Sequence, residues 1–153
     1  MRVLVTGGAG YIGSVATGML LERGFDVTVL DDCSTGHRDA VVAGAKLIEG
    51  SVLSEESLAL ALVDCEAVFH FAAKSLVGES VEKPDLYFDV NVNGTKNLLK
   101  QMSLAKISKL VFSSTAATYG EPEVIPISEN AKTDPTSPYG ATKLAVDKLI
   151  TGE

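Results

Sequence analysis

The fold is decided near the N-terminus by RVLVTGGAGYIG, residues 2–13. The apolar run Arg2–Thr6 predicts a short buried strand, and apolar residues at helical spacing from Tyr11 to Glu22 predict a helix after the glycines. The turn satisfies both Gly-x-Gly-x-x-Gly, with Gly8, Gly10 and Gly13, and Gly-x-x-Gly-x-x-Gly, with Gly7, Gly10 and Gly13. This order of strand, glycine turn and helix is typical of a loop that binds a diphosphate through the amides of a helix N-terminus.

An acidic residue in the expected place supports a dinucleotide site. Phe25–Leu30 (FDVTVL) predicts a second strand, and Asp31 follows it with Asp32 beside it. A carboxylate at this position accepts hydrogen bonds from ribose hydroxyls and repels a 2′-phosphate, so it selects NAD over NADP. The alternative, a structural glycine turn followed by a solvated acidic loop, explains fewer of these features. We therefore predict that the chain binds NAD.

Size and composition narrow the class of protein. The 153 residues, 46% hydrophobic and 22% charged, suit one soluble domain covering residues 1–153. The net charge of −7 argues against nucleic-acid binding. No apolar run approaches the roughly 20 residues that span a bilayer, and the start lacks a signal-peptide core, so we expect a cytoplasmic protein. Cys33 and Cys65 form neither a disulfide framework nor a metal-binding pair, and we expect free thiols and no metal.

The rest of the chain alternates between strands and helices. Further strands are predicted at residues 45–49, 67–72 and 109–113, and further helices at 54–63, 84–103 and from Ser137 onward. Residues 121–138 hold four of the five prolines and predict an extended loop. Right-handed crossovers between these elements predict an α/β fold, a Rossmann-type doubly wound parallel sheet of about five strands in the order 3-2-1-4-5, with helices on both faces. His70, on the fourth strand, is predicted to be a packed core histidine.

A possible acid/base pair lies on the last predicted helix. Tyr139 and Lys143 are four residues apart and therefore share one helix face. A tyrosine hydroxyl has an ordinary pKa near 10, but a nearby ammonium favours the phenolate, which can take a proton from a substrate hydroxyl. Ser113, Ser114 and Thr115 end the fifth predicted strand, where this fold places ligands, and one of their hydroxyls is expected to orient the substrate.

Five segments together resemble a known family. They are TGGAGYIG (6–13), HFAAKSLVGES (70–80), NVNGTKNLL (91–99), FSSTAATYGEP (112–122) and SPYGATK (137–143). They are similar to the extended short-chain dehydrogenase/reductase family and, within it, to the UDP-glucose 4-epimerases. The resemblance implies that tightly held NAD removes hydride from C4 of a UDP-hexose and returns it to the other face of a 4-keto intermediate.

The resemblance also implies roles for individual residues. Tyr139 would be the base, Lys143 its modulator and a ribose anchor, and Thr115 the hydroxyl beside the sugar. The other implied cofactor contacts are Gly7, Gly10, Tyr11, Ile12, Gly13, Asp31, Ser51, Val52, Phe71, Ala72, Ala73, Asn91 and Ser113. Sugar-nucleotide 4,6-dehydratases look similar but carry Thr-Asp-Glu where this chain has Thr115-Ala116-Ala117, so epimerisation is favoured over dehydration.

The chain departs from the family pattern in three ways. Gly50-Ser51-Val52 stands where the family usually has an aspartate, and Ser75 where many epimerases have a lysine next to the position of Lys74. The family is also about twice as long, so the chain is expected to correspond to its N-terminal part. A homodimer through the helices at 84–103 and 138–150 is expected. Two alternatives stay open: an NAD-binding module without catalysis, and another sugar-nucleotide epimerase or reductase.

Overall fold

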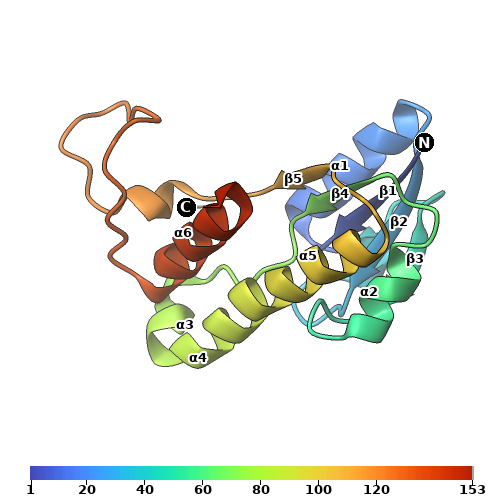
Figure 1. Cartoon of the computed structure of the whole chain (residues 1–153), viewed down its shortest axis with the longest axis horizontal. Helices are drawn as coiled ribbons and strands as arrows, with labels where there is room; N and C mark the ends of the chain where they lie inside the picture. The colour runs from blue at the N-terminus through green and yellow to red at the C-terminus, as the bar shows by residue number, and fades with distance from the viewer. Residues whose placement is uncertain (153) are drawn as a thin grey trace. The chain divides into compact units, whose positions relative to one another are not determined.

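The computed structural model describes residues 1–152, which form two compact units (Figure 1). The first, here called the sheet unit, comprises Met1–Ala72 and Gly94–Ser113. The second, here called the α6 unit, comprises Ala73–Asn93 and the residues from Ser114 onward. The expectation of one domain over residues 1–153 stays a prediction. Among the described residues, no helix has both the length and the apolar character that crossing a membrane requires.

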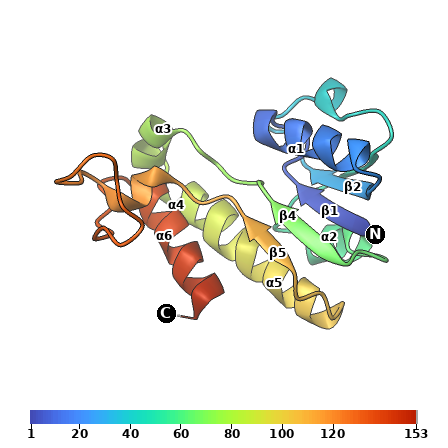
Figure 2. The same ribbon diagram turned by 90° about the horizontal axis from the view of Figure 1, so that it is seen from above.

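The sheet unit contains a parallel sheet with strand order β3-β2-β1-β4-β5. Its strands are β1 Arg2–Thr6, β2 Asp26–Asp31, β3 Lys46–Glu49, β4 Ala67–His70 and β5 Leu110–Phe112. Its helices are α1 Tyr11–Glu22, η1 Arg38–Ala40, α2 Glu55–Ala61 and α5 Gly94–Leu104. Figure 2 shows α1 on one side of the strands and α2 and α5 on the other. The predicted fold class and strand order are confirmed.

Alternation along β1 explains the two layers. Val3, Leu4 and Val5 are all fully buried, but Leu4 belongs to the core that includes Leu58 of α2 and Leu98 of α5, whereas Val3 and Val5 belong to the core on the other face. Successive side chains of a strand point to opposite faces, so a continuous apolar run requires helices on both. The apolar run at the start of the chain therefore fits a central strand, which is the position of β1 in the sheet.

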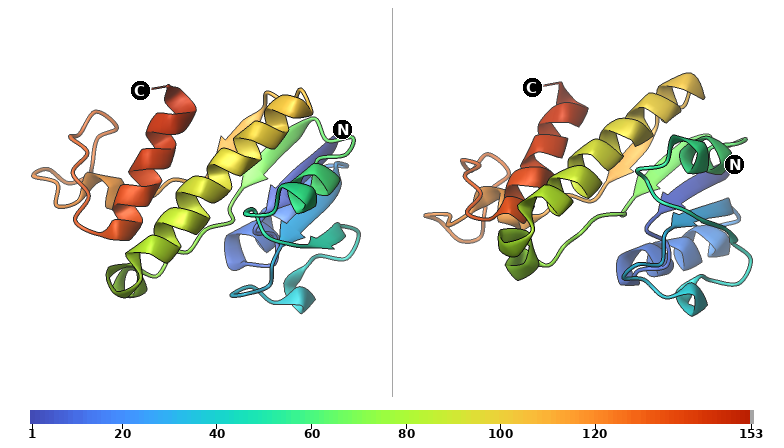
Figure 3. Two further views of the ribbon diagram at one scale, coloured as in Figure 1. Left: turned by 60° about the horizontal axis from the view of Figure 1, so that its bottom comes forward. Right: turned by 90° about the horizontal axis from the view of Figure 1, so that it is seen from below.

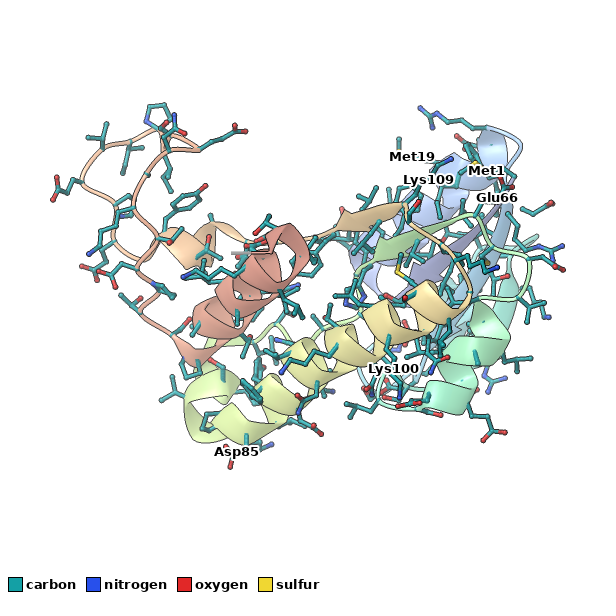
Figure 4. The ribbon with its side chains drawn as sticks, in the orientation of Figure 1. Met1, Met19, Glu66, Asp85, Lys100 and Lys109 are labelled. Carbon is teal, nitrogen blue, oxygen red and sulfur yellow. The ribbon has the colours of Figure 1, made fainter. Side chains whose placement is uncertain are left out.

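One surface contact joins the two helices on the same face of the sheet. Lys100 of α5, labelled in Figure 4, donates to Glu55 of α2 with Nζ 2.7 Å from Oε1. Gln101 donates to the other carboxylate oxygen of Glu55 at 3.2 Å. An exposed ion pair contributes at most about 1 kcal/mol, so the buried leucines beneath it supply most of the stabilisation.

The α6 unit is helical. It contains α3 Val77–Glu82, α4 Pro84–Tyr87, the π-helical segment η2 Phe88–Asn93, η3 Ala116–Tyr119 and α6 Pro138–Thr151. The first four of these all pack against α6, and Figure 3 shows α6 beside the turn formed by α3 and α4. The helix predicted at residues 84–103 is confirmed, because α4, η2 and α5 follow one another from Pro84 to Leu104. Its π-helical stretch and the short helix α3 were not predicted.

Helix starts follow the predicted caps. Ser54 caps α2, with its hydroxyl oxygen 3.1 Å from the Ser57 amide nitrogen. Ser137 caps α6 in the same way at 3.1 Å from the Gly140 amide, with Pro138 in the first turn. Each side-chain oxygen satisfies an amide that has no partner within the helix.

Two leucines of α2 test how much the core contributes. Leu58→Ala should lower the free energy of unfolding by about 2–5 kcal/mol, because Leu58 is fully buried beneath the sheet. Leu60→Ala is the matched control in the same helix, since Leu60 is 55% exposed, and it should change stability by less than about 0.5 kcal/mol. Urea unfolding followed by circular dichroism measures both, and equal losses would contradict this packing.

Candidate active site

The glycine turn of the sheet unit needs glycine for steric reasons. Gly7 has a φ of +74°, and its amide donates to the Leu30 carbonyl at 2.9 Å. A Cβ at Gly7 would lie 2.6 Å from the Ala72 backbone nitrogen, and a Cβ at Gly13 would lie 2.0 Å from the Gly7 carbonyl oxygen. Any side chain at these two positions would force the backbone apart. The turn and the start of α1 are therefore held in close contact by the absence of side chains.

Gly10 has a different reason to be glycine. It is the N-cap of α1, and a Cβ there would meet only the Gly7 carbonyl oxygen, at 3.4 Å. No side chain caps this helix, so its first amides are left for another acceptor. A bare turn in front of uncapped amides fits a diphosphate, which needs close approach to the backbone.

Asp31, and not Asp32, is tied to the glycine turn. Its Oδ2 accepts from the Ala9 amide at 2.9 Å, and its Oδ1 accepts from the Cys33 amide at 2.8 Å. Asp32 instead accepts from the Ser34 amide at 2.9 Å and is exposed. The half-buried Asp31 carboxylate is thus fixed at the end of β2, and its remaining lone pairs suit the ribose hydroxyls of an adenosine.

The segment after β4 lies directly against the same turn. Phe71 donates its amide to the Thr6 carbonyl at 3.0 Å, and Ala72 donates its amide to the Thr6 hydroxyl at 3.3 Å. His70 is 2% exposed, with Nδ1 2.6 Å from the Thr6 hydroxyl and Nε2 2.8 Å from the Thr95 hydroxyl. The prediction of a packed core histidine is confirmed, and its contacts align the chain that approaches Gly7.

The residues after β3 make their observed contacts with other residues of the sheet unit. Ser51 accepts the Leu53 amide at 3.2 Å, and Val52 is 5% exposed within the core. Gly50 donates its amide to the Asp31 carbonyl at 3.0 Å. The predicted cofactor contacts of Ser51 and Val52 stay predictions, as do those of Tyr11 and Ile12, which are exposed in the first turn of α1.

The α6 unit holds Tyr139 against a buried tyrosine. The rings of Tyr139 and Tyr87 meet edge to face, with centroids 6.5 Å apart and planes at 84°. Tyr87 is fully buried, and its hydroxyl accepts the Leu76 amide at 3.0 Å and lies 2.8 Å from the Leu76 carbonyl and 3.0 Å from a Glu79 carboxylate oxygen. These contacts hold the Tyr87 hydroxyl in place, so the buried Tyr87 ring is a rigid packing surface for the half-buried Tyr139 ring.

Lys143, one turn after Tyr139, is buried. Only 4% of it is exposed, and burial lowers the pKa of its ammonium from 10.5 to about 8. The negative charge of Asp147 opposes this shift and keeps the pKa from falling further. The lysine is therefore largely protonated at pH 7, in surroundings where its charge is weakly screened.

The three candidate hydroxyls at the end of β5 have different surroundings. Thr115 accepts the Ala117 amide at 3.2 Å as the N-cap of η3, an arrangement that leaves its own hydrogen for donation. Ser114 donates to Asp147, with Oγ 2.5 Å from Oδ2. Ser113 belongs to the sheet unit, where its amide donates to the His70 carbonyl at 3.2 Å. Of the two candidate hydroxyls in the α6 unit, Ser114 donates its hydrogen to Asp147, whereas Thr115 acts as an acceptor in its bond to Ala117.

Asn91 and Thr142 anchor the chain after Ala73, which is itself half-buried. Asn91 is 2% exposed, accepts the Lys74 amide at 2.8 Å and donates to the Lys74 carbonyl and the Thr142 hydroxyl, each at 3.0 Å. Thr142 in turn donates to the Tyr139 carbonyl at 2.8 Å. These bonds tie the loop to α6, and a direct contact of Asn91 with a cofactor stays a prediction. The roles of Thr142 and Tyr87 were not predicted.

The α6 unit also contains an open cavity of about 1000 Å³. Thr115, Ser114 and Asp147 line it together with Tyr119, Glu129 and Lys148. Among the described residues, no group of three or more histidine, cysteine or acidic side chains is arranged to hold a metal ion. Tyr139 and Lys143 are not among the residues that line this cavity, although they lie on the helix that forms one of its sides. The α6 unit as a whole offers a hydroxyl, a phenol and a buried ammonium, which suit proton transfer to and from an alcohol.

Comparison with known proteins identifies the family of the chain. Residues 3–152 match the model of the NAD dependent epimerase/dehydratase family. UDP-glucose 4-epimerase from Corynebacterium glutamicum is 57% identical over 151 residues, which cover 99% of this chain and 46% of that protein.

Two solved structures are also similar. UDP-glucose 4-epimerase from Brucella ovis in complex with NAD has a TM-score of 0.95 at 41% identity, over 99% of this chain and 47% of that one. The Stenotrophomonas maltophila enzyme, with bound NAD and formylated UDP-arabinopyranose, has a TM-score of 0.95 at 37% identity, over 99% and 48% of the two chains. This chain thus spans about half the length of the relatives it matches. Its match over almost all its residues makes it a member of the NAD dependent epimerase/dehydratase family.

Proposed function

We propose that this chain binds NAD in the sheet unit and supplies the proton-transfer group for epimerisation at C4 of a UDP-hexose, interconverting UDP-glucose and UDP-galactose. The observation that carries the proposal is the pairing of Tyr139 with the buried Lys143 on α6, in the unit that also presents the Thr115 hydroxyl. The similarity to UDP-glucose 4-epimerases supports the choice of substrate.

The sheet unit fits the cofactor through the glycine turn and Asp31. The uncapped amides of α1 would bind the diphosphate, and the Asp31 carboxylate would bind the adenosine ribose and exclude a 2′-phosphate. Phe71 and Ala72 follow the end of β4, and Ser113 follows the end of β5, at the edge where such sheets bind ligands. When bound, NAD supplies reversible removal of hydride from the sugar carbon.

The chain's own residues would handle the proton. Tyr139, as phenolate, would take the proton from the sugar hydroxyl and later return it. Lys143, one helical turn after Tyr139, would act as its modulator and as an anchor for the ribose. Thr115 would hold the same sugar oxygen by donating its hydroxyl hydrogen, because its oxygen already accepts the Ala117 amide. Ala116 and Ala117 offer no acid or base for dehydration.

A second function is an NAD-binding module without catalysis of its own, for which the glycine turn and Asp31 of the sheet unit would suffice. Another sugar specificity within the family is a third possibility. We further propose a homodimer and a cytoplasmic location for the protein, as the sequence predicts.

Two glycines of α1 give a matched test of NAD binding. Gly13→Ala should lower NAD affinity at least tenfold, because its Cβ would lie 2.0 Å from the Gly7 carbonyl oxygen and displace the turn. Gly18→Ala should bind NAD normally, because the nearest atom to its Cβ is a valine methyl at 3.9 Å. Isothermal titration calorimetry measures both affinities, and equal affinity in both variants would remove the glycine turn from the site.

Tyr139→Phe tests the proposed base. The variant keeps the ring against Tyr87 and loses only the hydroxyl, so NAD affinity should stay unchanged. Conversion of UDP-galactose to UDP-glucose should fall by about 10²- to 10⁴-fold, the usual contribution of an acid/base group. A coupled assay for UDP-glucose measures the rate. If the variant is as active as the parent chain, Tyr139 is not the base; if the parent is inactive while binding NAD, the module is favoured.

The buried Lys143 predicts a pH-dependent stability. Its pKa is about 8 when folded and near 10.5 when unfolded, so the unfolded chain binds more protons between these values. Its contribution therefore raises stability as pH increases from 8 to 10.5, and the cost of burying the ammonium is fully present below pH 8. Lys143→Met should be more stable than the parent at pH 7, and this advantage should shrink across that window.

Urea unfolding followed by tyrosine fluorescence gives the comparison at each pH. Lys148→Met is the matched control, because Lys148 is exposed on the same helix, and it should follow the parent at every pH. The parent also contains Cys65, and burial raises the pKa of this thiol to about 11. The thiol is present in all three proteins, so its contribution to stability cancels when the variants are compared with the parent. An advantage of Lys143→Met that does not change between pH 7 and 10 would contradict a buried ammonium.

A further inference from the structure

One short hydrogen bond connects the segment that carries Thr115 to the helix that carries Tyr139 and Lys143. Ser114 Oγ donates to Asp147 Oδ2 at 2.5 Å, in an exposed hydrogen bond to a charged acceptor. Ser114 directly precedes Thr115, and Asp147 follows Lys143 by one helical turn. Ser114, Thr115 and Asp147 all line the same cavity.

We propose that Asp147 is a positioning residue for the Tyr139–Lys143–Thr115 group: through Ser114 it helps to hold Thr115 near α6, and its negative charge acts on the Lys143 ammonium one helical turn earlier. A catalytic role for Asp147 rests on the proposed function. The hydrogen bond between Ser114 and Asp147 does not, because both residues lie in the α6 unit.

The Ser114–Asp147 hydrogen bond is linked to Thr115 and η3 through neighbouring hydrogen bonds. Thr115 Oγ1 accepts the Ala117 amide at 3.2 Å, and the Thr115 carbonyl accepts the Thr118 hydroxyl at 2.8 Å. These bonds fix η3 relative to Thr115, and η3 packs against α6 through Ala117 and Gly140. The Ser114–Asp147 bond adds a side-chain hydrogen bond to α6 at the residue immediately before Thr115. Losing it should let Thr115 move more freely relative to α6.

The charge of Asp147 acts on Lys143. Desolvation lowers the pKa of Lys143, and the Asp147 carboxylate is the group that raises it. Elements packed against α6 carry other titratable groups, namely Glu79 and Glu82 on α3, Asp85 and Tyr87 on α4, Asp89 on η2 and Tyr119 on η3. On α6 itself the others are Tyr139 and Lys148, and none of these groups shifts the pKa of Lys143 in the way that Asp147 does. Asp147 thus helps to keep the lysine protonated at neutral pH.

Three variants separate the hydrogen bond from the charge. Ser114→Ala removes the bond and keeps the charge. Asp147→Asn removes the charge and keeps an oxygen that accepts from Ser114, and Asp147→Ala removes both. Asp134→Asn is the matched control, because it removes an exposed carboxylate of the same unit that pairs only with Lys132 at its surface.

Amide hydrogen exchange of Ala117 tests whether the Ser114–Asp147 hydrogen bond holds Thr115 in place. Exchange should be at least tenfold faster in Ser114→Ala and Asp147→Ala than in the parent, and close to the parent rate in Asp147→Asn and Asp134→Asn. The physical reason is that the Ala117 amide is protected only while Thr115 stays in place. Unchanged exchange in Ser114→Ala and Asp147→Ala would overturn the anchoring role.

The titration of Lys143, followed by carbon-13 NMR of labelled lysine side chains, tests the effect of the Asp147 charge on the pKa of Lys143. The signal is assigned by its loss in Lys143→Met. In Asp147→Asn the pKa of Lys143 should fall below the parent value, and in Ser114→Ala and Asp134→Asn it should stay at that value. An unchanged pKa in Asp147→Asn would overturn the electrostatic role.

Catalysis is measured separately, so that the two proposals can fail independently. If the parent chain converts UDP-galactose, Ser114→Ala should lower kcat about tenfold or more with little change in KM, since a small misplacement of a substrate-holding group is costly. An unchanged kcat would overturn the link to the reaction. If the parent converts no substrate, the proposed function fails, and the exchange and titration results still decide whether Asp147 positions the group.

Discussion

The close contact between the glycine turn and the segment after β4 is the constraint on which the sheet unit depends. A single methyl group at Gly7 or Gly13 would collide with backbone atoms that cannot move away independently. The contact sets the start of α1 next to the end of β2, where Asp31 accepts the Ala9 amide. This geometry fits the proposed diphosphate site, because the helix begins at a bare backbone without a side-chain cap.

The α6 unit depends on a different constraint, the burial of a cation. An ammonium that is 4% exposed costs stability at neutral pH, since its pKa is lowered to about 8. Proteins keep such groups where they contribute to chemistry, and the surroundings of Lys143 fit that pattern. Tyr87 contacts the Tyr139 ring, Asn91 ties the backbone of Lys74 to Thr142 of α6, and Asp147 offsets part of the cost.

Much of the fold could be predicted from the sequence because its signals are local. Apolar runs gave the five strands, and Ser54, Ser137 and Pro138 marked helix starts that the structure confirms. The short helix α3 has no such signal, since six residues with a glycine show no clear periodicity. The π-helical segment η2 was missed because apolar spacing does not distinguish it from an α-helix.

The candidate site was predictable only in part. Residue type and spacing identify Tyr139, Lys143 and Asp31, whose chemistry is carried by their own side chains. The Tyr87–Tyr139 ring contact and the Thr142–Asn91 bond join residues far apart in the sequence, and no spacing rule points to them. Three neighbouring hydroxyls were equivalent on residue type alone. Only the hydrogen bonds of Ser114 to Asp147 and of Thr115 to Ala117 distinguish them.

Native mass spectrometry of the purified chain, before and after denaturation, tests NAD binding most directly. The folded chain should carry about one NAD, denaturation should release it, and added UDP-galactose should bind to the loaded species. A folded chain that takes up no NAD, even from a millimolar solution, would show that the protein is not NAD-binding in this form. The glycine turn and the buried lysine would then be structural features without a cofactor to serve.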